Sequence, residues 1–138
     1  MAEKSLKEVA AKMKQLDIAM LTTQTGKGQL TSRPMSNNGD VEYNGNSYYF
    51  TFEGARTVKD IDENAHVNLS FEGPKKLYIS INGKAALIRD KAKMKEHWVK
   101  DLEVWFENGL DTPGVVMIHV KAERIKYWQG EDEGEVKI

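Results

Sequence analysis

Cysteine is absent from the 138-residue chain, and the numbers of basic and acidic residues nearly balance, at 20 and 21. Without cysteine the protein has no disulfide scaffold, no thiolate zinc site, no iron–sulfur cluster and no cysteine nucleophile. Proteins that bind nucleic acids or anionic membranes without specificity need a basic excess or a basic patch. We therefore expect no nucleic-acid partner and no membrane partner.

Long apolar stretches are also missing. The first 16 residues contain no apolar core of the kind that a signal peptide has. No segment approaches the roughly 20 consecutive apolar residues that a membrane span needs. The default expectation is a cytoplasmic protein. The length fits one domain over residues 1–138, because domains usually have about 100–150 residues.

The sequence lacks four common motifs for catalysis and nucleotide binding, namely GxGxxG, GxxxxGK[ST], HExxH and GxSxG. Its histidines, His66, His97 and His119, are far apart and lack the spacing of metal ligands. A polar or partly buried position without a metal is the more common role for such residues, so no metal site is expected. No pair of carboxylates stands out as an acid–base dyad.

Short alternating or β-rich segments, separated by turn residues, predict six strands. Their expected ranges are 18–25, 29–36, 47–52, 65–71, 77–88 and 115–128. Most of these strands are joined by short turns, which favours an antiparallel sheet closed into a small barrel. Gly83 is expected at a bulge where its strand bends. Pro34 cannot donate a ladder hydrogen bond, so it indicates an edge, a bulge or a ligand beside its strand.

Helical patterns are expected at the N-terminus and between strands. Ser5 and Glu8 have the spacing of a capping box at the start of a helix that reaches about residue 16. Further helical segments are expected at 55–64, 90–99 and 101–108. The acidic tail, residues 129–138, is expected to be loosely ordered.

Basic and hydroxyl side chains gather in two places. Arg33 lies within a Thr-Ser-Arg-Pro-Met-Ser strand, and Arg56, Thr57 and Lys59 begin a predicted helix. A helix N-terminus offers free N–H groups and a positive dipole end, so nearby cations can complete a phosphate site without a P-loop. The same residues also fit ordinary surface charges. Trp128 and the tyrosine before it fit either core packing or a wall against a flat cofactor ring.

The order of several segments resembles the pyridoxamine 5′-phosphate oxidase-like family of FMN-binding split barrels. The segments that carry the resemblance are SRPM, YFTF, GARTVKDI, VNLSF, LYISINGKAAL and RIKYWQG. The segment HWVKDLEVWFENGLDTPGVVMIHV further resembles the Trp-containing insert of the short general stress protein branch. The resemblance covers about residues 5–130. It implies a mainly β fold, a six-stranded antiparallel split β-barrel with an N-terminal helix and short helices between strands.

The resemblance also implies a homodimer with two FMN molecules at the subunit interface. The strand residues that would line the flavin are Arg33, Pro34, Met35, Ser36, Phe50 and Thr51. Arg56 and Thr57 correspond to the two positions that hold the phosphate, and Lys59 is near enough in sequence to supply the charge that Thr57 lacks. Tyr78, reached from the partner subunit, and Trp128 correspond to positions close to the flavin.

The resemblance ends soon after Trp128. In the oxidases an Arg-x-His segment follows and grips the substrate phosphate, whereas here an acidic tail follows, which argues against oxidation of pyridoxine phosphate. The leading hypothesis is an FMN-binding flavoprotein of the general stress type, acting as an oxidoreductase whose flavin N5 accepts hydride from a reductant such as NAD(P)H. The alternatives are a non-catalytic protein that binds or sequesters flavin, and a split barrel that binds the deazaflavin F420 or haem.

Overall fold

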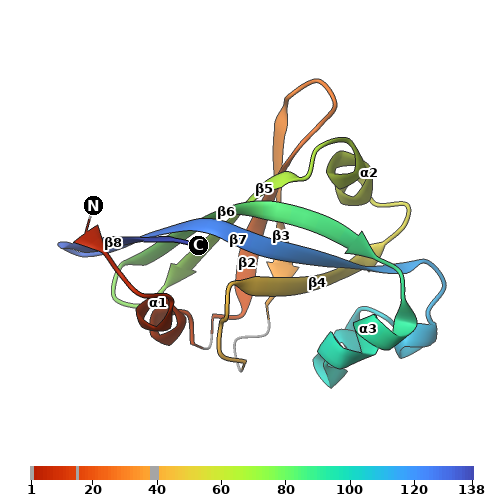
Figure 1. Ribbon diagram of the computed structural model, residues 1–138. Helices are drawn as coiled ribbons and strands as arrows, with labels where there is room; N and C mark the ends of the chain where they lie inside the picture. The colour runs from red at the N-terminus through yellow and green to blue at the C-terminus, as the bar shows by residue number, and fades with distance from the viewer. Residues whose placement is uncertain (1, 15, 38–40) are drawn as a thin grey trace.

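The computed structural model describes residues 2–14, 16–37 and 41–138, and its fold is mainly β (Figure 1). All six predicted strands are present, with ends within a few residues of those expected. They are β2 (Ile18–Gln24), β3 (Leu30–Ser36), β4 (Asn46–Phe52), β5 (His66–Gly73), β6 (Leu77–Ile88) and β7 (Val115–Gln129). Two further strands, β1 (Ala2–Glu3) and β8 (Asp132–Lys137), extend the sheet that the described residues form.

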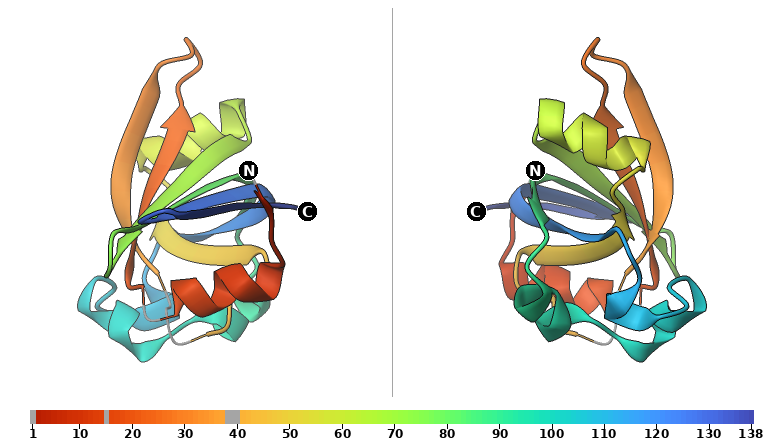
Figure 2. Two further views of the ribbon diagram at one scale, coloured as in Figure 1. Left: turned by 90° about the vertical axis from the view of Figure 1, so that its left-hand side faces the viewer. Right: turned by 90° about the vertical axis from the view of Figure 1, so that its right-hand side faces the viewer.

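The strand order makes the sheet a barrel that is open along one side. The order is β3-β2-β5-β6-β7, and β7 pairs with β4 along its first half and with β8 along its second. Within the described residues, β3 pairs only with β2, and β4 pairs only with β7. These two strands are therefore the edges of the split. Figure 2 shows β2 and β3 rising steeply from the level at which β4, β7 and β8 cross.

The main hydrophobic core fills the inside of the barrel. Its largest fully buried side chains include Tyr49, Leu21, Leu69, Ile81 and Ile125, one from each of five strands. Buried and more exposed residues alternate along β2, β5 and most of β6, as the two-residue period of a strand requires. One face of the sheet thus packs in the core, and the other face is more exposed and can contact other molecules.

The bulge predicted at Gly83 is confirmed, with the extra residue, Glu123, in the paired strand β7. The register between β6 and β7 shifts between Asn82 and Gly83. A Cβ atom on Gly83 would lie 2.4 Å from the main-chain oxygen of Lys121, so only glycine fits where the long strand bends.

Five helices complete the described chain. They are α1 (Leu6–Met13), α2 (Arg56–Glu63), α3 (Lys91–His97) and the 3-10 helices η1 (Lys100–Val104) and η2 (Gly109–Asp111). The predicted capping box of α1 is confirmed, because the Glu8 N–H donates to Ser5 Oγ at 3.2 Å and the Ser5 N–H donates to Glu8 Oε1 at 3.3 Å. None of these helices is long and apolar enough to cross a membrane.

The helix expected at 101–108 is replaced by the short 3-10 helix η1 and a turn. No side chain caps the start of η1, and short 3-10 segments are common as connectors between longer elements. Leu102 and Phe106 bury this segment in a second hydrophobic core that also holds Phe50 of β4 and Met94 of α3. The second core thereby fixes α3 and η1 against β4.

The acidic tail, expected to be loosely ordered, forms β8 and pairs antiparallel with β7. Val136 of β8 is buried in the main core. A Cβ atom on Gly134 would lie 2.6 Å from the ring of Tyr127, so this glycine lets the strand approach closely. Glu135 forms an ion pair with Arg124 of β7. Gly134 and Val136 occupy alternate, buried positions of β8, and this pattern makes the acidic segment a strand instead of a loosely ordered tail.

Candidate functional site

The predicted flavin strand β3 presents its four predicted residues on two faces. Arg33 and Met35 are half-buried and point to the barrel side of the strand, because they pair with fully buried residues of β2. Pro34 and Ser36 are exposed on the outer face. Pro34 lies on a strand edge of the split, as its missing N–H led us to expect.

Arg33 joins three elements through a largely buried network. Its guanidinium donates to Thr23 Oγ1 at 2.7 Å and lies 3.6 Å from a carboxylate oxygen of Asp60. The Thr23 hydroxyl in turn donates to Asp60 at 2.8 Å. Burial lowers the pKa of Arg33, and the charge of Asp60 opposes this effect. The network therefore ties α2 to β2 and β3, and Asp60 offsets most of the charge of Arg33.

The start of α2 has the features of an anion site. Ala55 occupies the N-cap and supplies no side-chain hydrogen bond, and the first turn contains no acidic residue. Arg56 and Lys59 are exposed in this turn, whereas Thr57 is buried. The uncapped N–H groups, the helix dipole and two cations all favour a negatively charged ligand here.

The predicted residues of β4 have different surroundings. Phe50 is buried in the second core, where its ring meets Trp98 edge-on with centroids 4.9 Å apart. Thr51 is half-buried and follows it on the other face of the strand. Phe50 thus has a clear packing role, and Thr51 is the residue of this pair that faces the barrel side.

Tyr78 and Trp128 form a separate group on the outer face of the sheet. They are directly opposite each other on β6 and β7. Tyr78 is 49% exposed and Trp128 is 37% exposed. Tyr78 pairs with Glu72, near the last residue of β5. The helix α2 comes before the first residue of β5 in the chain, and so lies near the other end of that strand. Within one chain, the structure does not bring this aromatic pair to the start of α2.

Residues 4–138 match the family described as pyridoxamine 5′-phosphate oxidase like. The chain belongs to this family. Among curated proteins, no sequence matches it significantly. The family prediction made from the ordered segments is therefore confirmed.

Solved structures of other proteins share the fold over nearly the whole chain. A Clostridium acetobutylicum protein related to general stress protein 26 of Bacillus subtilis has a TM-score of 0.83 and 21% identity, with 100% of this chain and 97% of that chain covered. A general stress FMN/FAD binding protein from Xanthomonas citri has a TM-score of 0.77 and 20% identity, with coverage of 92% and 89%. A heme binding protein from Mycobacterium smegmatis has a TM-score of 0.75 and 11% identity, with coverage of 99% and 60%. These similarities confirm the predicted split barrel, and a shared fold does not fix the ligand.

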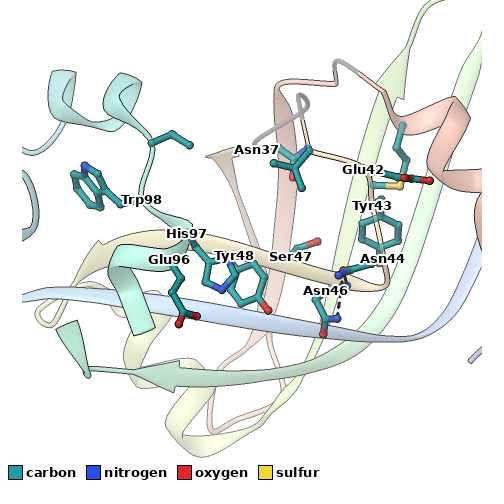
Figure 3. Close-up of a pocket in the computed structure, with 13 residues that line it drawn as sticks. Asn37, Glu42, Tyr43, Asn44, Asn46, Ser47, Tyr48, Glu96, His97 and Trp98 are labelled. Atoms are coloured by element: carbon teal, nitrogen blue, oxygen red, sulfur yellow. Dashed lines mark hydrogen bonds between the residues drawn. The ribbon is translucent and has the colours of Figure 1, made fainter. Parts of the chain in front are cut away.

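This oxidase-like barrel also contains a cavity of about 250 Å³ that no sequence pattern predicted (Figure 3). The cavity lies at the start of β4, at the opposite end of the strand from α2. None of the predicted flavin residues lines it. Its walls come largely from the segment before β4, from the start of β4 and from the end of α3, including Asn44, Tyr48, Glu96 and His97. Nothing in the sequence placed this segment beside α3, so no sequence signal indicated the cavity.

Stacked rings form one wall of the cavity. The ring of Tyr48 stacks on His97 with centroids 3.4 Å apart and on His119 with centroids 4.7 Å apart. The amide nitrogen of Asn46 donates to Asn44 Oδ1 at 3.3 Å, so Asn46 Oδ1 is the acceptor for His119 Nε2 at 2.8 Å. Burial lowers the pKa of His119, and its electrostatic interactions with His97 and Lys121 act in the same direction.

Proposed function

We propose that this protein binds FMN along the split of its barrel, with the phosphate at the start of α2. The observation that carries the proposal is the first turn of α2, which has no side-chain cap, no acidic residue and two exposed cations, Arg56 and Lys59. This donor set fits a phosphate, because uncapped helix N–H groups and adjacent cations recognise phosphate oxygens. The strands predicted to line the flavin, β3 and β4, are the edges of the split, and only three residues separate the end of β4 from the start of α2.

The two predicted arginines have different roles in this proposal. Arg56 is exposed and makes the direct contact with the phosphate. Arg33 is engaged with Asp60 and Thr23, so it positions α2 relative to β3 and contributes little net charge. Thr57 is buried within the helix turn, which leaves Lys59 as the second cation.

A second copy of the chain completes the site. The interior of the barrel is filled by side chains, as expected for a barrel of this size, so a flavin ring has to lie outside the core. Ile18, Met20, Tyr78 and Trp128 are exposed apolar residues on the outer face of β2, β6 and β7. A homodimer built on this face would bury them and bring one copy's Tyr78 and Trp128 to the flavin of the other.

A bound flavin would supply the redox chemistry, by accepting hydride at N5 from a reductant such as NAD(P)H. The chain's own residues bind the phosphate through α2, orient the ring between β3 and β4, and exclude water with the aromatic side chains of the second copy. The non-catalytic alternative is favoured by one observation: after Trp128 the chain turns into the acidic strand β8, which contains neither arginine nor histidine. In that alternative the protein holds flavin without a dedicated substrate.

Fluorescence titration of FMN with the purified protein tests the binding site. We expect Arg56→Ala to weaken FMN binding by at least about tenfold, because a hydrogen bond to a charged group contributes roughly 1.5–3 kcal/mol. Lys7→Ala, which removes an exposed cation from α1, is the matched control and should leave the affinity unchanged. Equal affinities for both variants would place the phosphate elsewhere. Stopped-flow mixing of the FMN-loaded protein with NADPH then separates the enzyme, which reduces its flavin rapidly, from the sequestering protein.

A further inference from the structure

The cavity beside β4 has an electronegative lining. Glu42, from the segment before β4, and Glu96, from α3, stand on opposite sides of it (Figure 3). Carboxylates are charged at neutral pH. Among the described residues that line the cavity there is no lysine or arginine. Lys95 and Lys100 are close in sequence to α3's end, but they are exposed and are not part of the lining.

The walls of the cavity are held in place before any ligand arrives. The side-chain nitrogen of Asn37 donates to the Leu16 carbonyl at 2.8 Å, and its oxygen accepts from the Tyr49 hydroxyl at 3.1 Å. On the other side, Tyr48 is fixed by its stacking on His97. A preformed wall lowers the ordering cost of binding, which is one mark of a small-molecule site.

Aromatic rings contribute to the lining as well. Tyr43 comes from the segment before β4, Tyr48 from β4 and Trp98 from the residue after α3. The ring of Tyr48 already stacks on His97 and His119, and that of Trp98 packs against Phe50 and Phe106, so these side chains offer apolar contact while the carboxylates attract a cation. The volume of about 250 Å³ is just below the usual range of roughly 300–1,000 Å³ for ligand pockets. Both features favour a small ligand with positive charge.

We propose that this cavity binds a small organic cation in which an amine or amidinium group is carried on a flat ring. The positive group pairs with one of the two carboxylates, Glu42 or Glu96, and the ring packs against the aromatic side chains of the lining. A phosphorylated or carboxylated ligand is disfavoured, because it would meet two negative charges and no lysine or arginine of the described lining. The site shares no residue with the proposed flavin site, so the proposal does not depend on flavin binding.

Three probes of one shape and different charge test the proposal: benzamidinium, benzamide and benzoate. Each is titrated into the flavin-free protein by isothermal calorimetry at pH 7.5. We expect benzamidinium to bind at least about tenfold more tightly than benzamide, the factor that corresponds to about 1.4 kcal/mol, and benzoate to bind most weakly. The double variant Glu42→Gln/Glu96→Gln should reduce the preference for benzamidinium over benzamide to about twofold or less.

The control is Glu107→Gln, the same change at an exposed residue that is not in the lining. It should keep the full preference. All the changed glutamates are exposed, and a thermal melt of each variant verifies that the fold is intact. The proposal is overturned if benzamidinium does not bind, if benzamide or benzoate binds as tightly, or if Glu107→Gln reduces the preference as much as the double variant. A separate FMN titration of the double variant should be unchanged, so a failure here is distinct from a failure of the flavin proposal.

Discussion

Replacing Arg33 with methionine would remove one partner of the network that joins α2 to the sheet. Asp60 is only 2% exposed, and without Arg33 its carboxylate would keep the Thr23 hydroxyl as its hydrogen-bond donor. Breaking a buried ion pair by removing one partner typically costs about 3–5 kcal/mol. The side chain of Arg33 is itself 19% exposed, so we expect a loss of about 2–4 kcal/mol in the free energy of unfolding after allowing for solvent screening.

Urea unfolding followed by circular dichroism measures this loss directly. An unfolding entropy of about 0.29 kcal/mol/K for a chain of this length converts the loss to a fall of about 7–14 °C in Tm. Arg56→Met is the matched control, because Arg56 is exposed on the same helix, and it should change stability by less than about 0.5 kcal/mol.

The double variant Arg33→Met/Asp60→Leu distinguishes an uncompensated buried charge from lost packing. Replacing both partners by apolar residues is often nearly neutral, so we expect this variant to recover most of the stability lost in Arg33→Met. If Arg33→Met costs no more than Arg56→Met, or if the double variant is less stable than Arg33→Met, the network does not hold α2 in place.

Three other predictions concern stability. Burial lowers the pKa of His119 in the folded protein, so the unfolded chain takes up the proton first as the pH falls. The protein therefore loses stability below about pH 6.5. His119→Gln should reduce this loss, as measured by urea unfolding between pH 7.5 and 5.5. Gly83→Ala should cost about 1–3 kcal/mol in urea unfolding, because its Cβ would overlap a main-chain oxygen, whereas Gly54→Ala has open space. Val136→Ala should cost about 1–2 kcal/mol in the same assay, because β8 buries this side chain, whereas Ile138→Ala, at an exposed position, should cost little.

Each of these predictions has a contradicting result. An unchanged pH dependence in His119→Gln would show that His119 titrates in the same way in the folded and unfolded chains. Equal stability of the two glycine variants would show that the bulge tolerates a side chain. If Val136→Ala unfolds at the same urea concentration as the unmodified protein, the tail is not part of the folded sheet.

Strand positions were predictable from the sequence because their signal is local. Along β5, the alternation of Val67, Leu69 and Phe71 with polar residues marks the core face directly. The bulge at Gly83 was predictable for the same reason, since a glycine inside an apolar strand often marks a bulge or the close approach of another backbone. The same reasoning gave the wrong result for the tail, because its composition is acidic and only Gly134 and Val136 of β8 are buried.

The candidate site was only partly predictable, because its contacts join distant parts of the chain. The sequence marked Arg33 as a cation for phosphate, but the structure pairs it with Asp60, 27 positions later, at 3.6 Å. Phe50 matched a flavin position by resemblance, yet its ring packs on Trp98 across a core that local patterns do not show. The cavity beside β4 was missed for the same reason, since Tyr48 and His97 stack although they are far apart in sequence.

The most direct test of the central claim compares FMN with riboflavin, which lacks the phosphate, in fluorescence titrations of the unmodified protein and Arg56→Ala. If α2 holds the phosphate, the unmodified protein binds FMN at least about tenfold more tightly than riboflavin. In Arg56→Ala most of this preference should disappear through weaker FMN binding, with the riboflavin affinity unchanged. A protein that binds neither flavin, or binds both equally well, would contradict the account.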